Sequence, residues 1–293
     1  MAKKIRYLIE AILFYFFYYI LKIFSFSFSS KLMGGLVRFI GPKLKQTRIA
    51  KHNIRKSIPE LSEDEIENLI PDIWESLGRI AGEFVNVYDL SEEEFKKHVT
   101  VKGLENVRRQ MDEKGQFLIV TAHIGNWEII PKVLLMEGMP IASVYRKANN
   151  PFVDKMIIKT RLKCNADLFP KGREGVKNIL KHIKNKGSLG MLVDQKMNNG
   201  IAVPFFGREA MTAPAIAELA LKFNLPLIPA RVKRTEGANF ELIFYPPIDV
   251  QGKDVLTIMT KVNSIFEEWI KKKPAQWFWV HKRWDKQEYK KLK

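Results

Sequence analysis

Cysteine is almost absent from the chain. Cys164 is the single cysteine among 293 residues, so neither an internal disulfide nor a cysteine-based zinc cluster can form. Acidic residues are also scarce, because 32 Asp and Glu stand against 49 Lys and Arg and leave a net charge of +17. The cysteine count excludes a disulfide-stabilised secreted scaffold, and a reducing compartment is the simplest setting.

The residues that are abundant fit a folded protein. Hydrophobic residues make up 46% of the chain and include 19 Phe, 8 Tyr and 6 Trp. Such a chain buries enough apolar surface to offset its ordering entropy, which excludes intrinsic disorder. The surplus of basic residues predicts anionic partners: nucleic acid, anionic lipid headgroups or an acidic carrier protein.

No uncharged apolar run is long enough to span a bilayer by itself. Residues 11–21 read AILFYFFYYIL, and as a helix they cover about 16 Å, roughly half of a bilayer's hydrocarbon core. Extension over residues 7–28 reaches about 33 Å but takes in Glu10 and Lys22, near its two ends. We predict that residues 1–30 form a membrane anchor, with residues 7–28 either crossing the bilayer or lying in its interface.

The flanking residues bear on the fate and orientation of this segment. The following FSFSFSS lacks the small-residue site at which signal peptides are cleaved, so retention is favoured over cleavage, and a buried soluble helix is the other alternative. More cations follow the run than precede it, which by the positive-inside rule places the body in the cytoplasm. The predicted location is the cell inner membrane, with the catalytic domain on its cytoplasmic face.

The rest of the chain, residues 31–293, predicts a single domain. Residues 31–98 show a helical pattern, with a capping box at SEDE from Ser62. Across residues 99–250, apolar strands such as QFLIVTA, IASVYR, GMLVD and PLIPARV alternate with helices, and residues 251–293 form a C-terminal helix and a basic tail. This alternation predicts an α/β fold with a largely parallel central sheet flanked by helices, whose active groups lie at the carboxyl ends of strands.

A histidine and a glutamate five residues apart follow the first buried strand. In TAHIGNWE, Gly125 provides a turn between His123 and Glu128, and Asn126 is placed to cap the next helix. We expect Glu128 to accept a hydrogen bond from one imidazole nitrogen, so that the other takes a proton from an alcohol. Five His and 32 acidic residues give about 0.5 such pairs by chance, so a structural histidine remains the alternative from spacing alone.

Several ordered blocks of sequence accompany this pair. They are TAHIGNWE, VYRKANNPFVDKMIIKTR, LGMLVDQ, VPFFGREAMTAPAIAELA and PLIPARV, with QWFWVHKRW near the end. Together they resemble the late acyltransferases of bacterial lipid A biosynthesis, the lauroyl and myristoyl transferase group, from about residue 5 to residue 285. In that family the HxxxxE motif is the catalytic dyad, which corresponds to His123 and Glu128.

The resemblance implies an activity and its partners. A hydroxyl of a phosphorylated glycolipid, a lipid A precursor, would attack the thioester of an acyl chain on acyl carrier protein. The expected partners are therefore that carrier, the glycolipid and membrane lipids, without nucleic acid, and we expect neither a cofactor nor a metal. Arginine suits phosphate, so Arg146, Arg161 and Arg208 are candidate substrate-binding residues, with structural ion pairs as their alternative.

Further candidates lie at strand and helix ends. Asp194 and Gln195 follow GMLVD and are predicted to orient an arginine or a sugar hydroxyl. Asn126, at a helix N-terminus, is predicted to donate to the developing oxyanion, and Lys171 opens a later helix that suits an anion. The rings and cations of QWFWVHKRW are typical of a membrane interface.

Two other functions remain compatible with the sequence. An acyltransferase for another glycolipid or a lysophospholipid would use the same dyad. A membrane-tethered nucleic-acid-binding protein would account for the net charge of +17, although no recognised nucleic-acid module appears.

Overall fold

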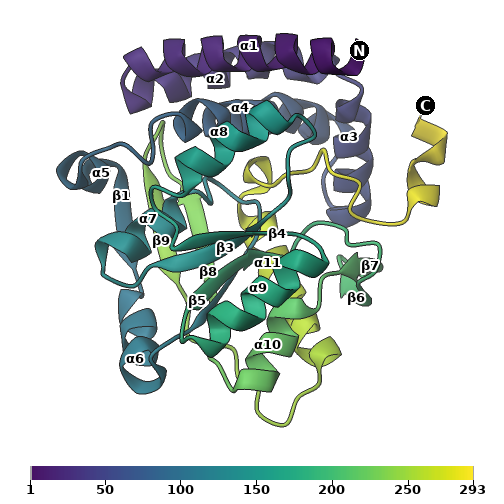
Figure 1. Cartoon of the computed structure of the whole chain (residues 1–293). Helices are drawn as coiled ribbons and strands as arrows, with labels where there is room; N and C mark the ends of the chain where they lie inside the picture. Colours follow the sequence, from purple (N-terminus) through teal and green to yellow (C-terminus); the bar gives the residue numbers. More distant parts are fainter. Residues whose placement is uncertain (1, 293) are drawn as a thin grey trace.

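A seven-stranded sheet forms the centre of the protein, whose structure is a computed structural model that describes residues 2–292 (Figure 1). The strands are β1 (Val99–Lys102), β2 (Leu118–Thr121), β3 (Ile141–Tyr145), β4 (Asp167–Pro170), β5 (Ser188–Leu192), β8 (Leu227–Arg234) and β9 (Phe240–Phe244). Their order is β1-β9-β8-β2-β5-β3-β4, and within it only β8 and β9 pair antiparallel. The predicted α/β fold with a largely parallel sheet is confirmed.

Alternating side chains of β2 enter two separate cores. Leu118 and Val120 contribute to a core shared with α9 (Arg173–Lys184), α10 (Ala215–Phe223) and α11 (Val255–Lys272). Ile119 contributes to the opposite core, shared with α5 (Glu92–His98), α6 (Leu104–Lys114) and α7 (Ile129–Met136). All four residues of β2 are buried, as expected for a parallel strand covered on both faces.

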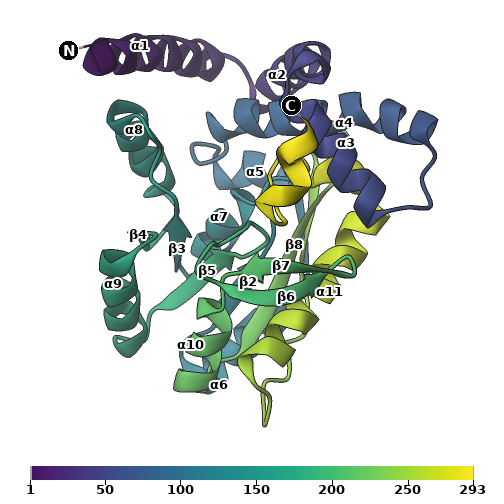
Figure 2. The ribbon, with the colours of Figure 1, turned by 90° about the vertical axis from the view of Figure 1, so that its right-hand side faces the viewer.

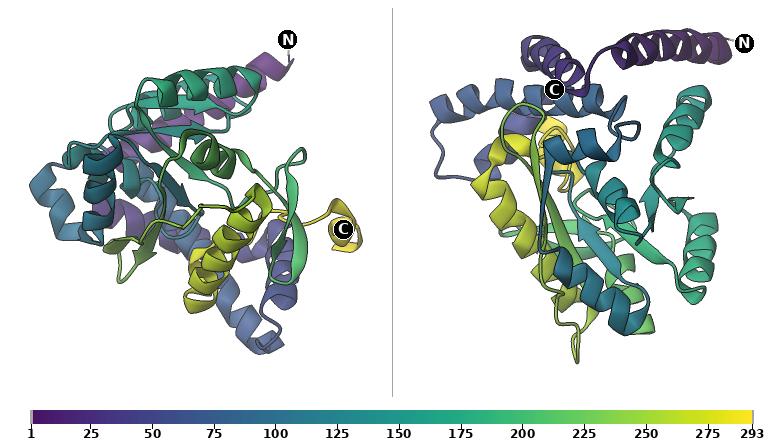
Figure 3. Two further views of the ribbon diagram at one scale, coloured as in Figure 1. Left: turned by 90° about the horizontal axis from the view of Figure 1, so that it is seen from below. Right: turned by 90° about the vertical axis from the view of Figure 1, so that its left-hand side faces the viewer.

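The first four α-helices of the chain gather at one end of the sheet, as two further views show (Figure 3). They are α1 (Ala2–Ile23), α2 (Phe26–Ile40), α3 (Gln46–Ser57) and α4 (Glu63–Phe84). The predicted capping box of α4 is present, with Ser62 and Glu65 bonding each other's backbone. A side chain at Gly82 would come within 2.2 Å of the Ser29 carbonyl oxygen, so glycine allows α4 to approach α2 closely.

Helix α1 lies above α8 (Pro151–Arg161) at the edge of the protein (Figure 2). Tyr15 Oη donates to the Phe152 carbonyl at 3.2 Å, and Tyr18 Oη lies 3.2 Å from Thr160 Oγ1. Among residues 2–292, no helix combines the length and the apolar character needed to cross a bilayer. Membrane anchoring by residues 1–30 therefore stays a prediction.

A broad apolar surface remains uncovered on α1 and α2. More than two-fifths of the surface of each contributing side chain is exposed: Ile5, Leu8, Ile9, Ile12, Leu13, Phe16, Phe17, Tyr19 and Ile23 on α1, and Phe28, Leu32, Leu36, Phe39 and Ile40 on α2. We call this surface the apolar ridge. A continuous exposed apolar surface is typical of a protein or membrane contact.

The C-terminal segment packs into the core, so its predicted place at a membrane interface is wrong. Trp277, Trp279 and Trp284 are at most 1% exposed, and the buried Arg283 donates to Thr212 Oγ1 at 2.6 Å. These rings pack on the hairpin of β6 (Ile201–Phe205) and β7 (Arg208–Thr212), where Phe205 stacks on Trp284 at 5.7 Å. The short helices η1 (Gly41–Lys43), η2 (Pro274–Gln276) and η3 (Lys286–Leu292) connect and end the chain.

Candidate active site

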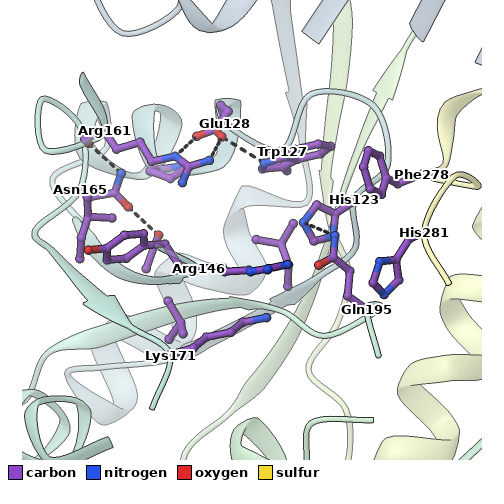
Figure 4. Close-up of a pocket in the computed structure, with 16 residues that line it drawn as sticks. His123, Trp127, Glu128, Arg146, Arg161, Asn165, Lys171, Gln195, Phe278 and His281 are labelled. Carbon is purple, nitrogen blue, oxygen red and sulfur yellow. Dashed lines mark hydrogen bonds and ion pairs between the residues drawn. The ribbon is translucent and has the colours of Figure 1, made fainter. Parts of the chain in front are cut away.

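A cavity of about 370 Å³ opens at the carboxyl ends of β2, β3 and β5 (Figure 4). Of the predicted site residues, the sheet brings His123, Glu128, Arg146, Arg161 and Gln195 to its lining. The strands β2, β5 and β3, which precede His123, Gln195 and Arg146, are neighbours in the sheet but lie far apart in the sequence, and α8 carries Arg161. The structure therefore assembles at one edge the groups that parallel strands are expected to gather there.

The carboxylate that holds His123 is Asp194. His123 Nδ1 lies 2.7 Å from Asp194 Oδ1, while Asp194 Oδ2 accepts from the His123 backbone N–H at 2.9 Å and from Trp277 Nε1 at 2.8 Å. An ionised Asp194 has no proton to give, so Nδ1 donates and the neutral ring keeps Nε2 unprotonated. Nε2 lies 3.4 Å from Gln195 Nε2 at the cavity. His123 is thus arranged as a proton acceptor.

The pKa of Asp194 supports this arrangement. Burial alone raises the pKa of a carboxyl, and Asp194 is 1% exposed. The charge of His123 and the hydrogen bonds from His123 and Trp277 outweigh burial and lower the pKa of Asp194 to about 2. The carboxylate is therefore ionised at neutral pH and accepts all three donors.

The predicted hydrogen bond between Glu128 and His123 is wrong. Glu128 faces Arg161, whose Nε donates to Oε2 at 3.1 Å and whose Nη2 donates to Oε1, and it also accepts from Tyr88 Oη. Trp127 lies between the two expected partners, with its ring centroid 4.7 Å from that of His123 (Figure 4). Because Glu128 is buried, it requires a cation, and α8 supplies Arg161.

Ionisation of both members of this second pair is favoured. Burial alone raises the pKa of Glu128, but the charge and hydrogen bonds of Arg161, with Tyr88 and Trp127, hold it below its usual value. Arg161 shows the reverse balance, because Glu128 outweighs burial and raises the pKa of its guanidinium. Arg161 therefore makes the structural ion pair that was the alternative to phosphate binding.

The turn that carries the motif depends on Gly125 and Asn126. Gly125 has φ +58°, and a side chain there would come within 2.2 Å of the Val232 carbonyl oxygen. Asn126 is fully buried: Oδ1 accepts from the Glu128 backbone N–H at 3.1 Å, and Nδ2 donates to Glu83 Oε2 at 2.9 Å. Asn126 is absent from the cavity lining and helix α7 starts later, at Ile129, so the predicted oxyanion contact of Asn126 is wrong.

Two cations remain available in the cavity. Arg146 directly follows β3 and Lys171 directly follows β4, and within residues 2–292 neither pairs with an acid. Figure 4 shows both side chains extending toward Gln195. Burial lowers the pKa of Lys171, Asp194 opposes this, and the charge of Arg146 lowers it further. The pair forms a positive wall that suits phosphate.

Arg208 lies outside this cavity, and its role in substrate binding stays a prediction. Its Nη1 donates to Glu288 at 2.6 Å, its Nη2 donates to Ser57 Oγ at 3.0 Å, and its guanidinium lies over the Trp284 ring. These contacts fasten the β6–β7 hairpin to α3 and to the C-terminal segment.

Sequence reasoning missed two groups of the cavity. Phe278 lies with its ring 6.0 Å from that of His123, and His281 lines the cavity beside Gln195 (Figure 4). The one available signal was the composition of QWFWVHKRW, which indicated an interface instead. Among residues 2–292, no three His, Cys, Asp or Glu side chains gather closely enough to hold a metal ion.

The fold and the paired His123 define a class of enzyme. Residues 1–286 match the family of bacterial lipid A biosynthesis acyltransferases, and the chain belongs to this family. It is therefore an acyltransferase, which selects the enzyme over the nucleic-acid-binding alternative.

Individual relatives are distant but extend over most of the chain. A lipid A biosynthesis acyltransferase of Haemophilus influenzae is 24% identical over 90% of this chain and 84% of its own length. Two Escherichia coli K12 proteins are each 25% identical: a lipid A biosynthesis lauroyltransferase over 82% of this chain and 79% of its own, and a palmitoleoyltransferase over 86% and 82%. The 1-acyl-sn-glycerophosphate acyltransferase PlsC of Thermotoga maritima is 13% identical, with a TM-score of 0.40 over 82% of this chain and 99% of its own.

Proposed function

We propose that the protein transfers a fatty acyl chain from the thioester of acyl carrier protein to a hydroxyl of a lipid A precursor at the cytoplasmic face of the inner membrane. The observation that carries the proposal is the pairing of His123 with Asp194 beside a cavity in which Arg146 and Lys171 have no acidic partner among residues 2–292. The family match supports an acceptor of the lipid A type.

His123 acts as the general base in this reaction. Its Nε2 takes the proton of the acceptor hydroxyl while the hydroxyl oxygen attacks the thioester carbonyl carbon. The resulting tetrahedral intermediate collapses with cleavage of the C–S bond, and the thiolate leaves with the proton from the imidazolium. Asp194 holds the ring in the required tautomer and stabilises its charged form.

Both substrates carry negative charge that the cations of the protein can bind. A phosphorylated disaccharide and the phosphopantetheine arm of the carrier both bring phosphate to the cavity, where Arg146 and Lys171 form the positive wall. Over the whole chain, the net charge of +17 attracts the acidic carrier and the anionic leaflet. Association with the carrier is therefore expected to weaken as salt rises.

A direct assay tests the function. The purified protein is incubated with a series of acyl carrier protein thioesters and a lipid A precursor, and the products are analysed by mass spectrometry. The proposal expects one added acyl chain with loss of one hydroxyl proton. A parallel reaction with a lysophospholipid acceptor tests the other acyltransferase, and acylation of that acceptor alone would contradict the lipid A assignment.

The apolar ridge is the proposed membrane contact. Its side chains are exposed on α1 and α2, and exposed cations lie on α2 and on the segment from η1 to the start of α3: Lys31, Lys43, Lys45 and Arg48. An apolar surface next to cations fits the boundary between acyl chains and anionic headgroups. In this arrangement α8 lies below α1, on the protein side of the membrane (Figure 2), and its Arg161 lines the cavity.

Charges on the ridge are expected to release the protein from membranes. Burial of one phenylalanine contributes about 1.5–3 kcal/mol, so the double variant F16D/F17D is expected to bind vesicles of phosphatidylethanolamine and phosphatidylglycerol at least about tenfold more weakly. Co-sedimentation measures the bound fraction. L256D changes an exposed leucine on α11 and is expected to bind normally. Equal binding by both variants would exclude the ridge as the contact.

A further inference from the structure

The imidazole of His281 is held in one tautomer at the cavity. Its Nε2 accepts a hydrogen bond from the backbone N–H of Lys196 at 3.0 Å. A backbone N–H can only donate, so Nε2 carries no proton and the neutral ring has its hydrogen on Nδ1. The proton on Nδ1 has no acceptor within the described part of the chain, residues 2–292.

The backbone of His281 is fixed as firmly as its ring. The buried Asn53 donates from Nδ2 to the His281 carbonyl at 2.9 Å and to the Trp279 carbonyl at 2.7 Å. The His281 N–H donates to the Phe278 carbonyl at 3.2 Å. Because both Nε2 of the ring and the backbone of His281 are held by hydrogen bonds, the ring is a preorganised donor, which loses little entropy when it binds a ligand.

His281 is neutral at neutral pH, because its pKa is lowered to about 4. Burial is the main cause of this lower pKa; Asp194 opposes it, and the charges of His123, Arg283 and Lys171 lower it further. The ring therefore presents one fixed N–H rather than a positive charge. Phosphate binding falls to Arg146 and Lys171, and a neutral donor suits an oxygen whose charge appears only during reaction.

Gln195 and Lys196 connect the two imidazoles. Gln195 Nε2 lies 3.4 Å from His123 Nε2, and the next residue donates its backbone N–H to His281. Figure 4 shows His123 and His281 near opposite ends of the Gln195 side chain. The base and the neutral donor therefore border the same part of the cavity.

We propose that His281 is a second catalytic residue, whose Nδ1–H donates a hydrogen bond to the carbonyl oxygen of the acyl thioester and stabilises the oxyanion that forms there. This rests on the proposed acyl transfer. As the new C–O bond forms, the carbonyl π electrons move onto that oxygen, which stays bound to Nδ1–H. When the C–S bond breaks, the electrons return, and the thiolate takes its proton from His123, so His281 keeps its own proton throughout.

Two substitutions separate this role from a structural one. In His281→Gln, the side-chain carbonyl oxygen can reach the former position of Nε2 and accept from Lys196, but no donor remains at the position of Nδ1. In His281→Asn, the shorter amide places a donor near Nδ1 and gives up the contact with Lys196. The catalytic role thus predicts greater harm to turnover from Gln, whereas a structural role predicts greater harm from Asn.

Steady-state kinetics with an acyl carrier protein thioester and the lipid A precursor provide the test. His281→Gln is expected to lower kcat about 10²- to 10³-fold, the usual effect of losing one oxyanion donor, with KM for the acceptor and the melting temperature close to wild type. His281→Asn is expected to retain the higher kcat of the two variants.

Two results would overturn the role of His281: wild-type kcat in His281→Gln, or a kcat for His281→Asn equal to or below that of His281→Gln. Failure of the proposed function looks different. In that case the wild-type protein itself transfers no acyl chain to any acceptor supplied.

Discussion

Asp194→Asn is expected to lower kcat for acyl transfer by about three to four orders of magnitude, close to the effect of His123→Ala. Asp194 Oδ2 accepts from two N–H groups, those of the His123 backbone and Trp277. The amide oxygen of asparagine must take this position, which turns its NH₂ toward His123 Nδ1. The imidazole then has to accept at Nδ1 and carry its proton on Nε2, where it cannot act as a base.

The kinetic measurement needs a control of the same chemistry. Asp167→Asn makes the same change at an exposed carboxylate on β4 and is expected to leave kcat within about twofold, because surface substitutions away from the site change little. His123→Ala with an unchanged melting temperature sets the level of complete loss. Asp194→Asn activity near that of Asp167→Asn would show that Asp194 does not orient the base.

The same variant has an effect on acid stability whose sign follows from its pKa. The pKa of Asp194 is about 2 in the folded protein against 3.8 for an ordinary aspartate, so the carboxylate stabilises the fold above pH 3.8 and this contribution is lost as the pH falls through 2. The shift corresponds to about 2 kcal/mol. Urea unfolding between pH 6 and pH 2 is therefore expected to depend less steeply on pH in Asp194→Asn.

The two carboxylates near His123 show what the sequence can predict about the site. Gly125 and the strand before His123 indicated a turn at the edge of a sheet, and the structure places the turn there. The partner of the imidazole was not predictable from local spacing. Asp194 is 71 residues away and reaches His123 because β5 lies next to β2, with the Val193 N–H bonded to the Thr121 carbonyl at 3.2 Å.

The fold was more accessible to prediction than these contacts. The apolar run QFLIVTA correctly located the buried strand β2, because the pattern reflects burial within one element. The prediction that the closing QWFWVHKRW lies at a membrane interface was wrong, because aromatic rings and cations occur together both at membrane interfaces and in cores with buried arginine. Only tertiary packing separates the two, by placing Arg283 against Thr212.

A buried ion pair joins the motif turn to three other parts of the fold, α4, β8 and α2. Glu83 on α4 is fully buried and accepts from both terminal nitrogens of Arg234 on β8, with Nη2 at 2.8 Å from Oε2. Glu83 also accepts from Asn126 Nδ2 at 2.9 Å and from Ser30 Oγ on α2 at 2.6 Å. The turn that carries His123 is therefore fastened to α2, one of the two helices of the apolar ridge, through one carboxylate.

Glu83→Ala is expected to lower the free energy of unfolding by about 3–5 kcal/mol, because it leaves the Arg234 guanidinium buried without a counterion. Glu63→Ala is the matched control: Glu63 also binds an arginine, Arg55, through both oxygens, but the pair is exposed and its loss is expected to change the free energy of unfolding far less. Urea unfolding followed by tryptophan fluorescence compares the two. Equal losses would mean that Arg234 finds water or another acceptor once Glu83 is removed. A larger loss in Glu83→Ala, with kcat reduced in the fraction that remains folded, is expected because Asn126 loses the acceptor that holds the His123 turn.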